Sequence, residues 1–594
     1  MERPKTCRSH TGPSIRSGGI GIVPGSPHLP DYPHRGGGLV GSHMKPVWDP
    51  NSVRHVHPAV WPQWPFDSPP EVRERSEPAY NIFSEYDLMI SMRDDVRLAA
   101  DVHRPRAAGQ KFPALISVSP YTRGLQLTEV PIGQNEAGIT EFWVARGYAH
   151  VIVDCRGSND SEGSYDDKAE KEQADYVDLI EWCAAQPWCN GSVGMIGCSY
   201  FALAQLLAAV HQPEALKAIF PYDAYTDMYR HRSTHGSVPH MGFASTWFSA
   251  VAALNLTSGR LRDPSGLRNM FDEGLSFSHP YDGEHYWRRS PSPHLDKVNI
   301  PVYFGCDWSF WWLHLAGVFT GWEEVGDVPK RILVGPEPEP RRPFGAYHEE
   351  TLRWYDHWLK GMDTGVMDGP PIQLYLRGDG HWRGEEEWPL KRTEWTRIFL
   401  GGPAGGGPSG GGEGTLSFSA GGGGERTYSP DVFGEDWRLG GSKLVYRSEP
   451  VDKPLEITGP LSLRLVARST AEDVDWFIAF MDEAPDGSAR MLTRGWLRAS
   501  HREVDELRSK PGRPWHSHKR SVPLTPGEEA VFEIELVPTC NVFQPGHRLR
   551  LEIASSGSVI ERPGYHEALP VKADNTILEG AEGSYLFAPV IPSA

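Results

Sequence analysis

The sequence predicts an α/β protein: a doubly wound sheet, interrupted by a helical insertion and followed by a separate all-β domain. Three observations predict this fold class. Apolar strand-like runs alternate with helical patterns up to about residue 369, the stretch 225–297 loses that alternation, and only short alternating runs follow Pro370. The 594 residues offer material for about three to four domains.

The elements are justified in chain order by their hydrophobic periodicity. The expected strands of the first part are 95–102, 113–118, 148–154 and 193–196, with a helix over 172–186. The segment that follows is rich in His, Ser, Trp and Arg and holds an amphipathic piece at 246–256, which predicts an inserted helical cap. Two further strands and a helix, at 300–304, 331–334 and 349–359, complete the sheet. The runs 374–376, 461–466 and 549–553 predict a sandwich or jelly roll.

The chain therefore divides into five expected parts. These are a tail (1–77), a first core part (78–224), the cap (225–297), a second core part (298–369) and a C-terminal jelly roll (370–594). The tail is dominated by Gly, Pro, Ser, His and Arg and cannot offset its ordering entropy by burial. Gly41-Ser42-His43-Met44 resembles an expression-vector scar, which makes Met44 a candidate start and leaves the origin of the preceding residues open.

Composition and charge exclude several classes of function. The net charge of −18 repels nucleic acid and anionic lipid, so a small-molecule partner is expected, with no nucleic acid and no membrane. The seven cysteines are odd in number and unclustered, which indicates reduced thiols. No long apolar segment and no signal peptide are found, so the expected location is cytoplasmic. A homodimer is left open.

The strongest local signal for chemistry is a strand that runs into Gly197-Cys198-Ser199 and then into a helix. This arrangement is typical of a nucleophile elbow, in which small neighbours let a strained turn raise the serine hydroxyl above the sheet. Phe201 stands where the strict motif has glycine, and the small residue arrives one place later, at Ala202. The alternative is an ordinary strand-to-helix turn.

Several motifs together resemble the cocaine-esterase and X-prolyl dipeptidyl aminopeptidase (CocE/NonD) family of α/β-hydrolases. Beside the elbow, they are Met92 to Leu98, Asp154-Cys155-Arg156-Gly157 with Ser161-Glu162-Gly163, Gln186 to Gly191, and Asn541 to Arg548. The resemblance runs from about residue 80 to the C-terminus. It implies an α/β-hydrolase core with a cap and a C-terminal jelly roll, and a serine hydrolase that works through an acyl-enzyme.

The resemblance also implies an oxyanion hole, and it leaves the acid less certain. Ser119-Pro120-Tyr121 matches the family's Pro-Tyr, so the Tyr121 hydroxyl and the N–H of Tyr200 are expected to bind the oxyanion; the alternative for Tyr121 is a half-buried tyrosine at a strand end. Asp307 is the predicted acid because it is the carboxylate in the loop after an apolar strand. It stands one place earlier than the family pattern, and a turn aspartate is the alternative.

The histidine departs furthest from the family pattern. No imidazole follows Gly335-Pro336, where the family normally has one. His348 falls on the apolar stripe of the next helix, whereas His357 points to the opposite face, so His348 is the predicted base. A structural histidine at the helix start is the alternative, and His314 is the reserve candidate.

The remaining candidates concern the substrate and other sites. Aromatic residues expected near the cleft favour a bulky apolar substrate, unless they are ordinary core: Trp247, Phe248, Trp308, Phe310, Trp311 and Trp312. Asp154 and Arg156 are predicted to form a buried structural pair. The irregularly spaced cap histidines His231, His235 and His240 are interpreted as a solvated or substrate-facing surface, and no metal and no cofactor are expected.

Three functions stay open from the sequence. The first is a hydrolase of carboxylic esters or activated acyl bonds. The second is an X-prolyl dipeptidyl aminopeptidase or amino-acid ester hydrolase, in which Asp272 and Glu273 would hold a substrate ammonium. The third is a catalytically silent binding protein on the same fold.

Overall fold

The computed structural model describes residues 66, 71, 73–124, 136–257, 279–336, 344–402, 413–430, 442–557, 564–566, 568–569 and 571–592. They belong to one compact unit, Val53–Ala594. Among these residues, no helix combines the length and the apolar character needed to cross a bilayer. The six cysteines described are free and buried, as their spacing predicts.

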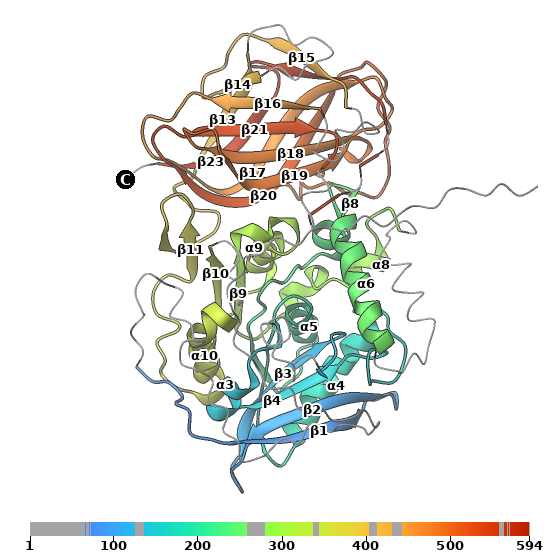
Figure 1. Cartoon of the computed structure of the whole chain (residues 1–594), viewed down its shortest axis with the longest axis vertical. Coiled ribbons are helices and arrows are strands. Elements are labelled where there is room, and N and C mark those ends of the chain that lie inside the picture. The colour runs from blue at the N-terminus through green and yellow to red at the C-terminus, as the bar shows by residue number, and fades with distance from the viewer. Residues whose placement is uncertain are drawn as a thin grey trace, which may run out of the picture. The chain divides into compact units, whose positions relative to one another are not determined.

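A ten-stranded sheet forms the first part of the fold, in the order β1-β2-β4-β3-β5-β6-β9-β10-β11-β12 (Figure 1). Its strands are β1 (Ile82–Ser91), β2 (Arg97–Pro105), β3 (Phe112–Ser119), β4 (Ala149–Asp154), β5 (Cys189–Met195), β6 (Leu216–Ile219), β9 (Val302–Asp307), β10 (Lys330–Gly335), β11 (Ile372–Leu376) and β12 (His381–Glu385). In sheet order, the strands from β4 to β11 are parallel, and β2 and β12 run antiparallel to them; β1 pairs antiparallel with β2 and so runs in the same direction as the parallel strands. The carboxyl ends of the parallel strands therefore meet at one edge, where α/β proteins place their sites.

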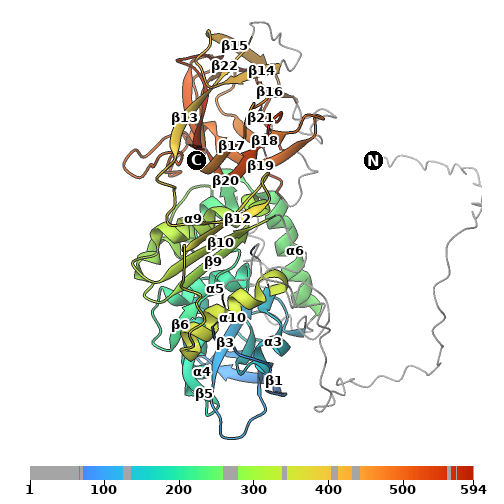
Figure 2. The same cartoon turned by 90° about the vertical axis from the view of Figure 1, so that its left-hand side faces the viewer.

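Helices cover both faces of this sheet (Figure 2). They are α3 (Thr140–Ala145), α4 (Glu170–Ala185), α5 (Tyr200–Ala209), α9 (Leu315–Glu324) and α10 (Phe344–Lys360). Two hydrophobic cores result, because adjacent strand residues point to opposite faces: Ile116 packs in the core that holds α4, α5 and α9, and Leu115 in the core that holds α3 and α10. The predicted doubly wound sheet is confirmed.

Residues 220–301 connect β6 to β9 and are called the β6–β9 insert below. Within its described part lie a π-helical turn (Met228–Ser233), the short pair β7 (Thr234–His235) and β8 (Val238–Pro239), helix α6 (Met241–Thr257), helix α8 (Glu284–Trp287) and a 3₁₀ turn (Ser292–Lys297). Helix α6 contains the predicted amphipathic piece at 246–256. Asp272 and Glu273 lie outside the described residues.

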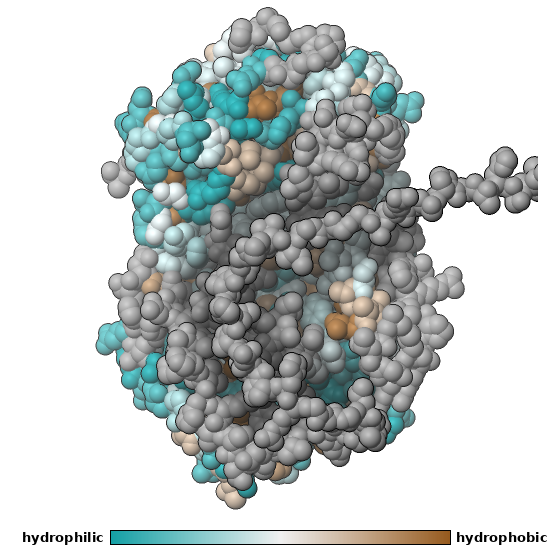
Figure 3. Space-filling view, viewed as in Figure 1, coloured by the Kyte–Doolittle hydropathy of each residue, from teal (hydrophilic) through white to brown (hydrophobic). Residues whose placement is uncertain are grey.

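The C-terminal β domain is one eleven-stranded sheet, and it closes on itself because β23 pairs with both β13 and β17. Its strands are β13 (Glu394–Gly401), β14 (Glu413–Ser417), β15 (Gly424–Tyr428), β16 (Lys443–Ser448), β17 (Leu455–Ser469), β18 (Asp475–Glu483), β19 (Ala489–Arg498), β20 (Ala530–Phe543), β21 (Arg548–Ala554), β22 (Asn575–Glu579) and β23 (Tyr585–Ile591). Alternate residues enter a separate core, as in β16. On the face shown in Figure 3, the described surface of this domain is mostly hydrophilic, with small hydrophobic patches.

Three boundaries and pairings differ from the predictions. The all-β domain does not begin at residue 370, because β11 and β12 extend the first sheet. The tail does not reach residue 77, because Ser76 donates to Asp356 of α10. Asp154 and Arg156 do not pair with each other.

Each of these two residues has a different partner. Asp154 binds Arg123 at 3.0 Å, and Arg156 binds Asp175 at 2.5 Å. Both pairs are buried, so the predicted structural role holds with other partners. The pair between Asp154 and Arg123 fixes the loop after β3 to the end of β4, which places Tyr121 at the carboxyl edge of the sheet.

Candidate active site

Ser199 occupies the sharp turn between β5 and α5. Its backbone angles are φ 58° and ψ −115°, in a region that residues with a side chain rarely adopt and that costs on the order of 1–3 kcal/mol. The surrounding structure enforces this conformation, because the Ser199 N–H donates to the carbonyl of Tyr222 and the Cys198 N–H donates to the carbonyl of Glu136. A strained serine at the start of a helix is the geometry of a nucleophile elbow.

Gly197 explains how the turn tolerates Phe201. A Cβ at Gly197 would lie 2.4 Å from the Cβ of Phe201 and 2.8 Å from the Glu136 carbonyl oxygen, and its φ is +127°. The strict motif has glycine two places after the serine, where this chain has Phe201. The space for the Phe201 side chain comes from the absence of a side chain at Gly197.

Tyr121 lies beside this turn. Its ring centroid is 6.2 Å from that of Tyr200 and 5.9 Å from that of Phe201. Burial raises the pKa of the Tyr121 hydroxyl well above its ordinary value, and Glu136 raises it further. The hydroxyl therefore keeps its proton and can act as a hydrogen-bond donor.

Trp247 of α6 sets the direction in which Tyr121 donates. Its indole N–H donates to the Tyr121 hydroxyl oxygen over 2.7 Å. Since an indole N–H only donates, the tyrosine proton must point elsewhere, and the bond also polarises the hydroxyl. The sequence placed Trp247 near the cleft but gave no sign of this bond, because helix α6 and Tyr121 are far apart in the chain.

Tyr200 is the first residue of α5, where N–H groups have no carbonyl partner inside the helix. Its side chain is held in place: the hydroxyl donates to Glu172 over 2.6 Å, and its ring stacks on that of Trp247 with centroids 6.1 Å apart. Burial raises the pKa of Glu172 to about 6. The sequence analysis missed this carboxylate, whose only signal is a polar residue on the buried stripe of α4.

Asp307 is the last residue of β9, buried and paired in register with Gly335 of β10. Its carboxylate accepts hydrogen bonds from the N–H and the hydroxyl of Ser309. A second buried carboxylate, Asp223, follows β6 and was missed by the sequence analysis. Burial is the main cause that raises the pKa values of the Tyr222 and Tyr347 hydroxyls. The negative charges of Asp223 and Asp307 raise both values further.

The two histidine candidates lie in different surroundings. His348 is buried, as its position on the apolar stripe predicts, and its ring packs on Phe142 of α3 with centroids 4.5 Å apart. Burial, together with the charge of Arg146, lowers the pKa of His348 to about 3, which makes it a weak proton acceptor in this arrangement. The described ring contact of His348 is therefore with α3.

His314 precedes α9, in the same connection as Asp307. Its ring stacks on Tyr225 with centroids 6.3 Å apart and on Phe310 with centroids 5.5 Å apart. Tyr225 in turn contributes to the raised pKa of the Tyr121 hydroxyl. His314 therefore belongs to the aromatic surroundings of the predicted oxyanion hole.

The aromatic residues expected at the cleft separate into four groups. Trp247 and Phe248 contact each other beside Tyr200, and Phe310 contacts Trp312. Trp308 is buried against Phe319 and donates to the Tyr375 carbonyl, and Trp311 packs on Trp496 of the β domain. Trp308 is therefore part of the core, which was the alternative for these residues.

The prediction that His231, His235 and His240 form a solvated surface is wrong, because all three are buried. His231, His235 and His240 are buried, at 8%, 7% and 0% exposure. Their spacing in sequence is irregular because they come from a π-helical turn, a short strand and the residue just before α6.

Comparison with known proteins covers nearly all of the described fold. The model of X-Pro dipeptidyl-peptidase (S15 family) matches residues 94–337, and that of the X-Pro dipeptidyl-peptidase C-terminal non-catalytic domain matches residues 364–586. Cocaine esterase of a Rhodococcus species is 28% identical over 592 residues, covering 85% of this chain and 98% of that protein.

Solved structures agree with these matches. A CocE/NonD family hydrolase from Staphylococcus aureus has a TM-score of 0.74 at 26% identity, over 86% of this chain and 94% of that one. An α-amino acid ester hydrolase shares the fold, with a TM-score of 0.64 at 19% identity, over 88% of this chain and 98% of that one. The strained serine, the α/β-hydrolase sheet that carries it and the β domain behind it thus lead to one conclusion: the chain is a serine hydrolase and belongs to the CocE/NonD, X-Pro dipeptidyl-peptidase-like family.

Proposed function

We propose that the protein cleaves carboxylic esters through an acyl-enzyme, with Ser199 as the nucleophile. The observation that carries the proposal is the strained backbone of Ser199 at the start of α5, beside the buried hydroxyl of Tyr121. The serine oxygen attacks the ester carbonyl, the alcohol leaves with the proton taken from the serine, and water then releases the acid.

The negative charge that develops on the carbonyl oxygen is bound by two donors in this proposal. One is the Tyr121 hydroxyl, whose proton the bond from Trp247 directs away from the indole. The other is the Tyr200 N–H, at the positive end of α5. Both are fixed before the reaction, so they stabilise the charge without reorganising.

The proton transfer needs an acid and a base. Asp307 is the proposed acid, because it ends a central strand at the same edge of the sheet as Ser199. His348 is kept as the predicted base and His314 as its alternative. The variants H348Q and H314Q decide between them: the one that removes the base lowers kcat by about 10²–10⁴-fold.

His357 provides a matched control for this pair. It lies on α10 with His348, and its Nδ1 contacts the carbonyl of Met362. H357Q is expected to keep kcat within about twofold, as substitutions away from a site usually do. If neither H348Q nor H314Q lowers kcat more than H357Q does, neither imidazole is the base.

The charges around Trp247 favour an uncharged ester over a peptide with a free amino terminus. Lys168 Nζ lies 5.4 Å and the Arg232 guanidinium 5.3 Å from the Trp247 ring centroid. Asp167 neutralises part of this charge, because it pairs with both cations. These three groups together keep one positive charge, which disfavours the ammonium group of an X-Pro peptide here, whereas a neutral ester would face an aromatic wall.

Two measurements test the proposal. A fluorophosphonate probe should label the wild-type chain and the variant S192A, in which a serine of β5 is replaced, but not S199A. Labelling that survives in S199A, or a wild type that is not labelled at all, would overturn the nucleophile and favour the silent binding protein.

The second measurement compares kcat/KM for p-nitrophenyl esters and for X-Pro anilides. Esters with aromatic or bulky acyl groups are expected to be the better substrates. A higher kcat/KM for the anilides would replace the esterase by the peptidase alternative and leave the role of Ser199 intact.

A further inference from the structure

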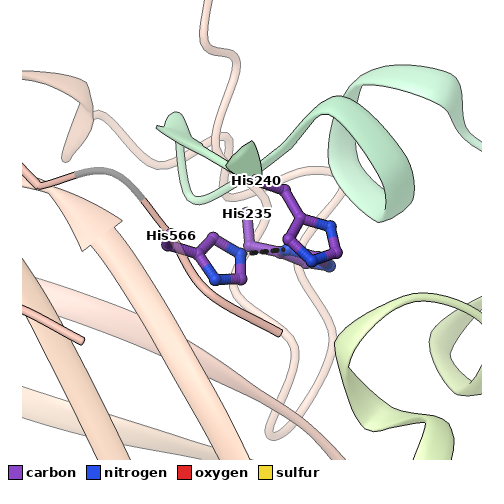
Figure 4. A group of neighbouring side chains, drawn as sticks. All are labelled: His235, His240 and His566. Atoms are coloured by element: carbon purple, nitrogen blue, oxygen red, sulfur yellow. Dashed lines mark hydrogen bonds between the residues drawn. The ribbon is translucent and has the colours of Figure 1, made fainter. Parts of the chain in front are cut away.

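Three buried histidines meet between the β6–β9 insert and the C-terminal β domain (Figure 4). His235 ends β7, His240 directly precedes α6, and His566 comes from the chain between β21 and β22. One ring nitrogen of each lies within 4.8 Å of those of the other two, and the Nδ1 of His235 is 2.7 Å from the Nε2 of His566. Four ligand atoms around a zinc ion at about 2.1 Å lie roughly 3.4 Å apart. The separations of 2.7 Å and up to 4.8 Å in this cluster lie on either side of that spacing.

Backbone carbonyls orient two of the rings. The Nδ1 of His240 is 3.2 Å from the Arg232 carbonyl oxygen, and the Nδ1 of His566 is 2.9 Å from the Gly564 carbonyl oxygen. A carbonyl oxygen only accepts, so each Nδ1 carries the proton and each Nε2 carries a lone pair. An imidazole that donates its other N–H to a carbonyl is the usual outer shell of a metal-binding histidine.

Aromatic contacts position the three rings. Trp496 of β19 packs on His566 and His235, with ring centroids 4.3 Å and 4.8 Å apart. The rings of His240 and His566 lie nearly parallel, with centroids 4.5 Å apart and 8° between their planes, so they turn toward each other when both bind one ion.

A cavity of about 80 Å³ opens onto one ring of the cluster, that of His235, which lines it together with Gly236 and Trp496. This volume is several times the roughly 10–15 Å³ that one water needs. A solvent molecule can therefore approach the cluster from the side of His235 and serve as a fourth ligand.

We propose that His235, His240 and His566 bind one divalent ion of the zinc class, with a solvent oxygen as the fourth ligand. Imidazole donors select Zn²⁺, Co²⁺, Ni²⁺ or Cu²⁺ and not Mg²⁺ or Ca²⁺, which need oxygen ligands. The ion replaces the hydrogen bond between His235 and His566, and the proton of His235 moves to its other ring nitrogen. The site joins the insert that carries Trp247 to the β domain, and it is independent of the chemistry proposed for Ser199.

The test uses the full chain without an affinity tag. Chelator-treated protein is titrated with Co²⁺, and bound metal is measured by elemental analysis and by the visible bands of tetrahedral cobalt. The wild type is expected to bind one more equivalent than H566Q or H240Q. For these variants, the affinity of the site should fall by at least about 10–100-fold, the range known for weaker outer-shell changes.

Two control variants keep the comparison specific. H231Q removes a buried histidine of the same insert, outside the cluster, and H381Q removes a more exposed one. Both should keep the tetrahedral cobalt bands. The histidines before residue 66 are present in every variant, so the differences report on the cluster alone.

Folding is followed by circular dichroism so that a misfolded variant is recognised. If H566Q and H240Q both misfold, Zn²⁺ must raise the Tm of the wild type, with one equivalent saturating the effect. The proposal is overturned if folded wild type and variants bind the same amount of metal. It is also overturned if the wild type shows neither tetrahedral cobalt bands nor a Tm shift.

Discussion

The proposed nucleophile half of the site (Tyr121, Ser199 and Tyr200) and the proposed acid–base half (Asp307 with His314 or His348) are held in different ways. In the nucleophile half, each group follows shortly after a central strand, and contacts between α5, α6 and the loop after β3 fix it. In the acid–base half, Asp307 ends a strand, but the imidazole comes from another element. His348 packs on α3, and His314 packs on Tyr225.

This difference separates what a short motif can encode from what must be assembled. A strand end followed by a strained turn is specified within a few residues, and Gly197 and Ser199 carry the information. The alignment of a carboxylate with an imidazole depends on the packing of α9 and α10 on opposite faces of the sheet. The substitutions below test each half separately.

The largest effect is expected in the acid–base half. Asp307→Asn should lower kcat by about 10⁴-fold, because an amide no longer holds the imidazole in the correct tautomer. The matched control is Asp223→Asn, at the other buried carboxylate beside Tyr222 and Tyr347. If the Asp223 variant loses more kcat than the Asp307 variant, while both unfold at similar temperatures, the acid follows β6 and not β9.

In the nucleophile half, Tyr121→Phe should lower kcat by about 10²–10³-fold with little change in KM, because one of two oxyanion donors is lost. Tyr225→Phe is the control, since the Tyr225 hydroxyl is buried nearby but contacts the sulfur of Met228. Equal losses in the two variants would mean that Tyr121 contributes by packing only.

A smaller effect is expected for Trp247→Phe, which keeps an aromatic ring beside Tyr200 but removes the N–H bound to Tyr121. The loss of one hydrogen bond predicts a fall in kcat of about 2–10-fold. Because Trp247 would act through Tyr121, the double variant with Tyr121→Phe should be no slower than Tyr121→Phe alone. Additive losses would contradict this positioning role, and Trp312→Phe controls for the loss of a neighbouring indole.

A last prediction concerns stability, and not the rate of catalysis, beneath the nucleophile half. His150 of β4 contacts the hydroxyl of Ser117, which donates to the carbonyl of Ile196 before the elbow. Burial lowers the pKa of His150 from 6.5 to about 3, so the unfolded chain binds a proton below pH 6.5 that the folded chain does not. The free energy of unfolding should therefore fall with decreasing pH by about 1.4 kcal/mol per pH unit for this residue.

Other groups titrate in the opposite sense. Burial raises the pKa of Asp154 and of Glu172 to about 6, so these carboxyls add stability as the pH falls. The measurement is therefore the difference in pH slope between the wild type and H150Q, obtained from denaturant unfolding between pH 6.5 and 4. An equal slope in both proteins would show that His150 is protonated in the folded state.

Much of the fold could be predicted from local patterns. The strands at 113–118, 148–154 and 193–196 match β3, β4 and β5 because buried parallel strands are continuous apolar runs. The assignment of β11 and β12 failed, because alternating runs such as Leu374-Tyr375-Leu376 look the same at the edge of an α/β sheet and in a sandwich. Their partners, and not their periodicity, decide the domain to which they belong.

The site divides in the same manner. The elbow and the resemblance predicted Ser199, Tyr200 and Tyr121 as site residues, whereas Glu172, Asp223 and the bond from Trp247 were not predicted. Nothing in the sequence indicates that His566 lies beside His235 and His240, since His566 follows His235 by 331 residues. Only the folding of the chain brings these side chains into contact.

The sequence by itself determined the order of strands and helices and the sharp turn that carries Ser199. These depend on periodicity and on small residues at turns, which act over a few positions. The tertiary structure decided which carboxylates are buried beside Tyr347, on which helix His348 packs and which histidines converge. Contacts of this kind arise from side chains at opposite ends of the chain, and their energies depend on burial that no local pattern contains.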